Sequence, residues 1–151
     1  MNFLVRLAAT FFWVGYLPLA PGTFGSLAGA LIAWFFYPEL AILAGVFTVT
    51  GFLVCRPAQR VLRGIDPPEF VLDEVCGMML SVAALPKTPI LFAAAFLLFR
   101  ALDIYKPWPV SRIQAWKNPI GILADDLAAG LFVNLILQIL VNSRLLSPLF
   151  P

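Results

Sequence analysis

The stretch GILADDLAAG, residues 121–130, places two adjacent carboxylates inside an apolar run that continues to residue 141. A charged side chain at the middle of a membrane-spanning helix costs roughly 2.5–3.5 kcal/mol on insertion scales. Asp125 and Asp126 therefore need compensation from a bound cation, a basic partner or water. Which of the three applies depends on what the rest of the chain brings near them.

Apolar residues dominate the composition. Of the 151 residues, 62% are hydrophobic and 12% are charged, whereas about 25% charged residues are usual in soluble domains. This composition predicts an integral membrane protein, and the length fits a single domain over residues 1–151. The net charge of +2, with no basic run, argues against a nucleic-acid partner.

Five apolar runs predict an all-α fold, a polytopic membrane helix bundle with about four to five membrane-embedded helices and short interfacial helices. The runs are residues 27–37, 40–55, 70–85, 90–102 and 122–141. An aromatic helix over residues 3–16 either lies at the interface or enters the membrane, and the Trp-rich segment 105–119 is expected to be interfacial. Residues 17–26, with two prolines and two glycines, are expected to form a loop. Gly25 and Gly29 suit close helix packing.

Basic residues indicate the orientation of these runs. The arginine-rich segment 56–69 is placed in the cytoplasm by the positive-inside rule. Counting spans from there puts residues 17–26 and 103–121 on the same side and residues 86–89 outside. Seven of the eight acidic residues then lie at or near cytoplasmic ends of the runs: Asp66, Glu69, Asp73, Glu74, Asp103, Asp125 and Asp126. Separate parts of the chain are thus expected to bring carboxylates to one depth at one membrane face.

Crowded carboxylates repel one another, and a divalent cation removes that repulsion. The chain has no histidine, and its two cysteines, Cys55 and Cys76, sit in apolar stretches where burial without a disulfide is expected. Oxygen ligands alone favour Mg²⁺, Mn²⁺ or Ca²⁺ over zinc.

Basic and hydroxyl groups accompany the acids. Arg100, Lys106 and the segment 21–26, which carries glycines and hydroxyls near a predicted helix start, are natural partners for a phosphate. Acids for a metal, bases for a phosphate and a membrane location together indicate phosphoryl chemistry on a lipid headgroup.

Several phosphatase chemistries lack the residues they need. A cysteine phosphatase requires Arg six positions after its Cys, and those positions are Val61 and Val82. The absence of histidine excludes a histidine-based lipid phosphatase, and neither a DxDx[TV] aspartyl-phosphate loop nor the DGxxAR signature of CDP-alcohol phosphotransferases is present. Two alternatives from other classes stay open. One is a small cation-binding transporter with acids along an ion path, and the other is a structural membrane subunit whose acids pair with a partner.

Four blocks of this chain resemble the phosphatidylglycerophosphatase A family, in the family's order and spacing. They are LAPGTFGSLAG (19–29), DPPEFVLDEVCGMM (66–79), FRALDIYKPWPV (99–110) and GILADDLAAG (121–130). The resemblance implies a Mg²⁺-dependent enzyme of the bacterial inner membrane that converts phosphatidylglycerophosphate to phosphatidylglycerol. Short runs such as 27–37 would be better covered by a second copy, so a homo-oligomer is an alternative to a monomer.

The resemblance also implies roles for individual residues. The metal-site acids would be Asp73, Glu74, Asp125 and Asp126, and Asp66 and Asp103 fall in the same motifs as further catalytic acids. An acid among Asp66, Asp103 or the metal set would orient or deprotonate water. The substrate-binding residues would be Pro21, Gly22, Thr23, Ser26 and Lys106, together with Arg100 from the residue pattern above.

Overall fold

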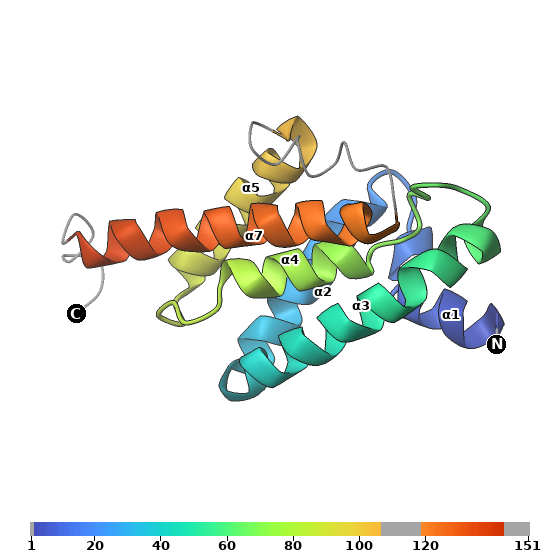
Figure 1. Cartoon of the computed structure of the whole chain (residues 1–151). Coiled ribbons are helices and arrows are strands. Elements are labelled where there is room, and N and C mark those ends of the chain that lie inside the picture. Colours follow the sequence, from blue (N-terminus) through green and yellow to red (C-terminus); the bar gives the residue numbers. More distant parts are fainter. Residues whose placement is uncertain (1, 107–118, 144–151) are drawn as a thin grey trace.

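The regular structure of the described chain is helical. The computed structural model describes residues 2–106 and 119–143. Its elements are α1 (Asn2–Ala9), the 3₁₀ turn η1 (Val14–Tyr16), α2 (Pro21–Phe35), the 3₁₀ turn η2 (Tyr37–Glu39), α3 (Leu40–Leu62), α4 (Leu72–Ser81), α5 (Pro89–Tyr105) and α7 (Pro119–Asn142). No strand occurs in these two ranges, which confirms the all-α prediction (Figure 1). The predicted interfacial tryptophans, Trp108 and Trp116, lie outside the described residues.

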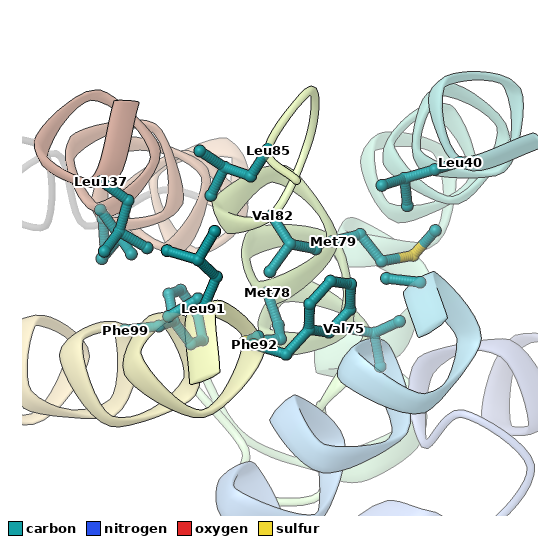
Figure 2. Packing of buried hydrophobic residues seen from close by; sticks show 14 residues of the cluster. Leu40, Val75, Met78, Met79, Val82, Leu85, Leu91, Phe92, Phe99 and Leu137 are labelled. Atoms are coloured by element: carbon teal, nitrogen blue, oxygen red, sulfur yellow. The ribbon is translucent and has the colours of Figure 1, made fainter. Parts of the chain in front are cut away.

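The short helix α4 is the centre of the molecule. Eight of its ten residues are buried, and it packs against α2, α3, α5 and α7 (Figure 1). Its apolar side chains Val75, Met78 and Met79 belong to the main core cluster, together with Phe92 and Phe99 of α5 (Figure 2). A helix of ten residues is about 15 Å long, roughly half of a hydrocarbon core. Within the predicted run 70–85, α4 is therefore an enclosed core helix rather than a complete span.

Glycines allow the helices around α4 to approach closely. A Cβ on Gly29 of α2 would lie 2.7 Å from the carbonyl oxygen of Val75 in α4, and one on Gly25 would lie 2.8 Å from the Cβ of Val71. On the other side of α4, a Cβ on Gly130 of α7 would overlap the backbone carbonyl of Gly77. The predicted role of Gly25 and Gly29 in close packing is confirmed, and α4 is clamped between two glycine-bearing helices.

The prediction of a loop over residues 17–26 is wrong for its second half. Helix α2 begins at Pro21 and runs through Thr23 and Ser26 without interruption. Proline suits the first turn of a helix, because it lacks only an N–H that would be unpaired there and its φ is already helical. Ser26 does not cap a later helix start; its hydroxyl donates to the carbonyl of Gly22, one turn earlier, at 2.8 Å.

The predicted N-terminal helix over residues 3–16 is divided by a turn. Phe11, Phe12 and Trp13 all have positive φ. The hydroxyl of Thr10 donates to the carbonyl of Arg6 at 2.9 Å and accepts from the N–H of Trp13 at 3.2 Å. The carbonyl of Ala9 accepts from the N–H of Val71 at 3.0 Å. Helix α1 therefore ends at Ala9 because side-chain and tertiary hydrogen bonds replace the next helical turn.

Within residues 2–106 and 119–143, two helical stretches have the length and composition to cross a membrane. They are Tyr37–Leu62, with 26 residues, and Ile120–Asn142, with 23. Of the most apolar 18 residues in each stretch, only 17% are buried in the first, against 50% in the second. Helix α3 continues seven residues beyond the predicted end at Cys55 and includes Arg56 and Arg60. The predicted unpaired cysteines are confirmed, since Cys55 and Cys76 are both free and buried.

Candidate active site

A polar cavity of about 260 Å³ lies where the start of α4, the end of α5 and the first turns of α7 meet. Its lining joins segments that are far apart in sequence: Asp66, Pro67, Pro68, Phe70, Asp73, Glu74, Asp103, Lys106, Ile122, Asp125 and Asp126. Most of these side chains are polar, in a protein whose surface and core are mostly apolar. The cavity is therefore the place where the described chain concentrates its charged chemistry.

The first turn of α4 supplies two carboxylates. Asp73 and Glu74 follow the helix start directly, and the Oδ1 atom of Asp73 accepts a hydrogen bond from the N–H of Glu74 at 3.0 Å. The N-terminus of a helix favours negative charge because its unpaired N–H groups and its dipole point toward that end. The buried start of α4 thus holds both acids at the cavity.

Three carboxylates from two helices approach one another closely. Ligand oxygens of Asp73, Glu74 and Asp126 all lie within 4.8 Å of one another. Asp73 and Asp126 are only 5% and 4% exposed. The Oε2 atom of Glu74 is buried and has no hydrogen-bond partner within the part of the chain that the structure describes. Two buried aspartates and the half-buried Glu74, whose Oε2 has no partner among the described residues, form a donor set that fits a hard divalent cation.

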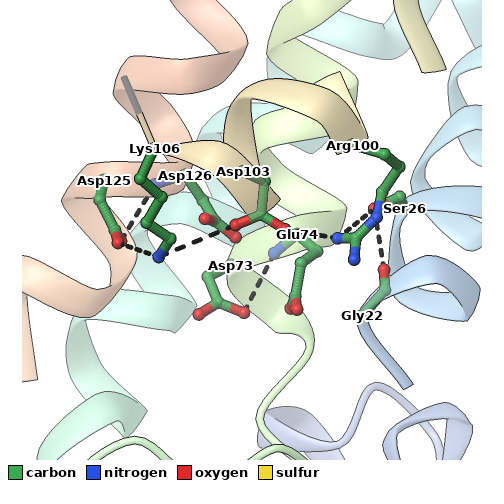
Figure 3. A network of polar contacts seen from close by, with 9 residues as sticks. All are labelled: Gly22, Ser26, Asp73, Glu74, Arg100, Asp103, Lys106, Asp125 and Asp126. Carbon is green, nitrogen blue, oxygen red and sulfur yellow. Dashed lines mark hydrogen bonds and ion pairs between the residues drawn. The ribbon is translucent and has the colours of Figure 1, made fainter. Parts of the chain in front are cut away.

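Lys106 faces this acidic set from the end of α5. Its Nζ atom lies 2.6 Å from Oδ2 of Asp125 and 3.9 Å from Oδ1 of Asp103 (Figure 3). Burial alone would lower the pKa of Lys106, but the hydrogen bond and charge of Asp125, with the charges of Asp126 and Asp103, raise it above its usual value. The ammonium therefore stays protonated at the edge of the cavity.

Arg100 lies behind the cavity wall. It is one turn earlier on α5 than Asp103, and its Nη1 atom lies 2.5 Å from Oδ2 of that residue. The same atom donates to the hydroxyl of Ser26 at 3.4 Å (Figure 3). Arg100 is absent from the cavity lining, unlike Lys106. Of the two basic residues predicted as phosphate partners, Lys106 therefore lines the cavity and Arg100 lies outside its lining.

The first turns of α2 press against the acidic set. A Cβ on Gly22 would overlap Oε1 of Glu74 and would lie 3.2 Å from Nη1 of Arg100. Figure 3 shows Gly22 and Ser26 on the side of Arg100 that faces away from Lys106. Glycine at this position lets the backbone of α2 support Glu74 and Arg100 at close range.

Comparison with known proteins places the chain in a family. The family model for phosphatidylglycerophosphatase A matches residues 7–141. The chain belongs to the phosphatidylglycerophosphatase A family. It is therefore a lipid phosphatase, and the family match favours an enzyme over the cation transporter or structural subunit that the sequence left open.

Curated relatives agree with this membership over most of the chain. The Escherichia coli phosphatidylglycerophosphatase A is 33% identical, over 83% of this chain and 76% of its own length. The Haemophilus influenzae phosphatidylglycerophosphatase A is 32% identical, over 87% and 85%. A Bacteroides thetaiotaomicron relative, provisionally named a phosphatidylinositol-3-phosphatase, is 31% identical, over 91% and 94%. No solved structure matches the chain.

The structure brings most of the predicted site residues of this family member together. Seven of them line the cavity: Asp66, Asp73, Glu74, Asp103, Lys106, Asp125 and Asp126. Gly22, Ser26 and Arg100 support the wall from behind, as described above. Pro21 and Thr23 lie half-buried in the first turn of α2 and do not line the cavity. Asp66 is exposed, so it lies at the rim.

Four apolar lining residues were missed by the sequence reasoning: Pro67, Pro68, Phe70 and Ile122. The carbonyl of Pro67 accepts from the N–H of Phe70 at 2.9 Å, which makes a turn directly before α4. Phe70 is buried and also belongs to a core cluster with Leu72. Their positions in the sequence could have indicated them, because they lie within a few residues of Asp66, Asp73 or Asp125.

Proposed function

We propose that this protein removes the terminal phosphate of phosphatidylglycerophosphate, with Mg²⁺, to give phosphatidylglycerol. The observation that carries the proposal is the close set of Asp73, Glu74 and Asp126 beside the ammonium of Lys106 in one polar cavity. Membership of the phosphatidylglycerophosphatase A family, and the names of the Escherichia coli and Haemophilus influenzae relatives, support this substrate.

The donor set supports Mg²⁺ as the cation. Mg²⁺ binds through one or two carboxylates and keeps its remaining positions for water and substrate phosphate oxygens. Asp73, Glu74 and Asp126 would hold it, and a cation would satisfy Oε2 of Glu74, which has no hydrogen-bond partner among the described residues. The family resemblance also implied Asp125, but both of its carboxylate oxygens accept hydrogen bonds within the protein. A bound Mg²⁺ would polarise the phosphate and lower the pKa of a bound water.

The other residues of the cavity have complementary parts in the proposal. Lys106 contacts the non-bridging phosphate oxygens, since its ammonium lies at the cavity edge. Arg100 orients Asp103 through their ion pair and keeps its place through Ser26 and Gly22. Asp66 at the rim and Asp103 in the wall are the candidates for accepting a proton from the attacking water.

We further propose that the bundle is membrane-embedded along four to five helices, in a bacterial inner membrane, with the cavity facing the cytoplasm. The exposure of large apolar side chains on α2, α3, α5 and α7 supports this, as does the low burial of the apolar α3 window. Arg63 follows α3 and precedes the cavity-lining segment, whereas Lys87 lies at the opposite end of α4. The proposal includes a homo-oligomer in which a second copy of the chain covers the short helices.

Labelling of single cysteines tests this orientation. Arg63→Cys and Lys87→Cys are matched, because both residues are exposed and lie at opposite ends of the bundle. A membrane-impermeant maleimide should label Arg63→Cys in inside-out vesicles and Lys87→Cys in right-side-out vesicles. The reverse pattern would contradict a cytoplasmic cavity. The native Cys55 and Cys76 are buried and should contribute little background.

Release of inorganic phosphate by the purified full chain tests the activity. Phosphatidylglycerophosphate and phosphatidylinositol 3-phosphate are compared in the same mixed micelles, with Mg²⁺ and with a chelator. We expect Mg²⁺-dependent release from phosphatidylglycerophosphate at the higher kcat/KM. A preference for the inositol lipid would instead align the chain with its Bacteroides thetaiotaomicron relative. Glu39→Gln, an exposed acid far from the cavity lining, is the control and should retain full activity.

A further inference from the structure

Two adjacent aspartates in α7 have different partners in this structure. Asp126 belongs to the set of three carboxylates with Asp73 and Glu74, and Asp125 does not. Successive residues of an α-helix point about 100° apart, so neighbouring carboxylates on one helix face different neighbours. Asp125 instead points at Lys106, with its Oδ2 atom 2.6 Å from Nζ (Figure 3).

Both carboxylate oxygens of Asp125 are engaged within the protein. Its Oδ1 atom accepts from the N–H of Asp126 at 3.1 Å, and its Oδ2 atom accepts from Lys106. In contrast, Oε2 of Glu74 is buried without a partner in the described chain. The oxygen that still lacks a partner therefore lies in the other set, and Asp125 already has the hydrogen bonds that a buried carboxylate needs.

We propose that Asp125 is a positioning residue that holds Lys106 at the cavity for the substrate phosphate, and that it is not a ligand of the cation. The inference rests on the proposed function, because it assigns Lys106 to the phosphate of a phospholipid. It divides the pair of aspartates into Asp126 for the cation and Asp125 for the ammonium.

The position of Lys106 in the fold explains why its side chain needs a partner that fixes its conformation. It follows the last residue of α5 in a left-handed conformation, with φ of 41°. A lysine side chain has four rotatable bonds and loses substantial conformational entropy when it is fixed in one conformation. Asp125, 3% exposed on a different helix, fixes the ammonium from across the cavity, while Asp103 on α5 is farther away at 3.9 Å.

Cation binding separates the two roles without any substrate. We would titrate the purified full chain in detergent with Mn²⁺, used as a spectroscopic substitute for Mg²⁺, and compare Asp125→Asn with Asp126→Asn. Asp126→Asn should weaken Mn²⁺ binding by about tenfold or more, since even residues that support a metal ligand cost about 10–100-fold in affinity. Asp125→Asn should leave Mn²⁺ affinity within about threefold of wild type. An equal loss in both variants would overturn the proposal.

Kinetics then test whether Asp125 acts through Lys106. Asp125→Asn and Lys106→Met should each raise KM by about tenfold to a hundredfold, the range expected for losing a hydrogen bond to a charged group. The double variant should be no worse than Lys106→Met alone, because two changes in one interaction are not additive. Independent, additive losses would overturn the positioning role. Asp125→Glu, which keeps the charge, should recover part of the loss.

The two proposals fail in different ways. Asp125→Asn retains the shape of the side chain and the oxygen that accepts from the N–H of Asp126, so it should fold. Lys106→Met tests the same pair from the lysine, which is half-buried. A wild-type chain that binds Mn²⁺ but releases no phosphate from phosphatidylglycerophosphate contradicts the substrate assignment alone. Loss of Mn²⁺ affinity in Asp125→Asn contradicts the positioning role alone.

Discussion

The two ends of the α4–α7 contact differ in whether their buried polar groups have hydrogen-bond partners. At the far end, Asn134 of α7 donates to the carbonyls of Ser81 and Ala83 at 3.2 and 2.7 Å, and its own Oδ1 accepts from Gln138 at 2.8 Å. At the cavity end, Oε2 of Glu74 and Nε of Arg100 are buried without hydrogen-bond partners in the described chain.

This difference separates a structural polar cluster from a functional one. The amide cluster at Asn134 satisfies the carbonyls that the C-terminus of α4 leaves open, and it therefore stabilises the fold. The carboxylates at the start of α4 repel one another and keep an unpaired oxygen, so they stabilise the fold only when a cation or substrate arrives. Substitutions at the two ends should consequently separate activity from stability.

The largest effect is expected from Asp126→Asn. It should lower kcat/KM for phosphate release by more than about 100-fold, because residues that merely support a metal ligand already cost about 10–100-fold. Its thermal midpoint without divalent cation should equal or exceed that of wild type, since one charge leaves a crowded acidic set. Phosphate release and circular dichroism measure the two quantities. A variant that loses activity only because it unfolds would break the comparison.

The bound cation should itself stabilise the folded wild-type chain. A ligand present at 100 times its dissociation constant stabilises the folded state by about 2.7 kcal/mol. Saturating Mg²⁺ should therefore raise the thermal midpoint of the wild-type chain, and a chelator should reverse the rise. The same addition to Asp126→Asn should have little effect. A similar rise in both chains would indicate that Mg²⁺ binds elsewhere.

At the other end, Asn134→Ala should act on stability instead. The carbonyls of Ser81 and Ala83 lose their donor, and a buried unsatisfied group costs about 1–3 kcal/mol. Thermal denaturation in detergent should show the loss, while kcat per folded molecule stays close to wild type. Gln138→Ala is the matched control, because it removes only the outer amide and should cost less. A large drop in kcat with unchanged stability would contradict a purely structural role.

The smallest effects come from adding a single methyl group. Gly22→Ala should reduce activity, since its Cβ would overlap Oε1 of Glu74, and overpacking costs about 1–3 kcal/mol. Gly45→Ala is the control in α3, where a Cβ meets nothing within 4 Å. There the change should stabilise the helix by about 0.5–1 kcal/mol without altering kcat/KM. Equal behaviour of the two variants would show that α2 does not support the acidic set.

Sequence reasoning went furthest where residue type alone decides the outcome. The apolar runs predicted helices, and the absence of histidine, with both cysteines in apolar stretches, left oxygen ligands as the chemistry available to the acids. Counting spans also predicted that carboxylates from separate runs would meet, and Asp73, Asp103 and Asp126 do line one cavity. These inferences needed only composition, spacing and the alternation of helices.

Helix boundaries and side-chain partners were the harder part. Residues 21–26 read as a loop because of their glycines and proline, yet they form the first turns of α2, where Gly22 and Gly25 are needed for contact with α4. Glycine occurs both where helices pack closely and where helices end, so its presence in a sequence does not distinguish the two roles. Asn134 likewise gave no signal, since its carbonyl partners belong to a different helix.

What the sequence determined by itself was the chemical inventory: an all-helical apolar chain, acids that suit a hard cation, and two basic residues near them. Only the tertiary structure decided how this inventory is divided, with Asp126 among the carboxylates, Asp125 on Lys106 and Arg100 behind the wall. The physical reason is direction. Side chains one position apart on a helix point about 100° apart, and which neighbour each one meets depends on how closely the helices pack.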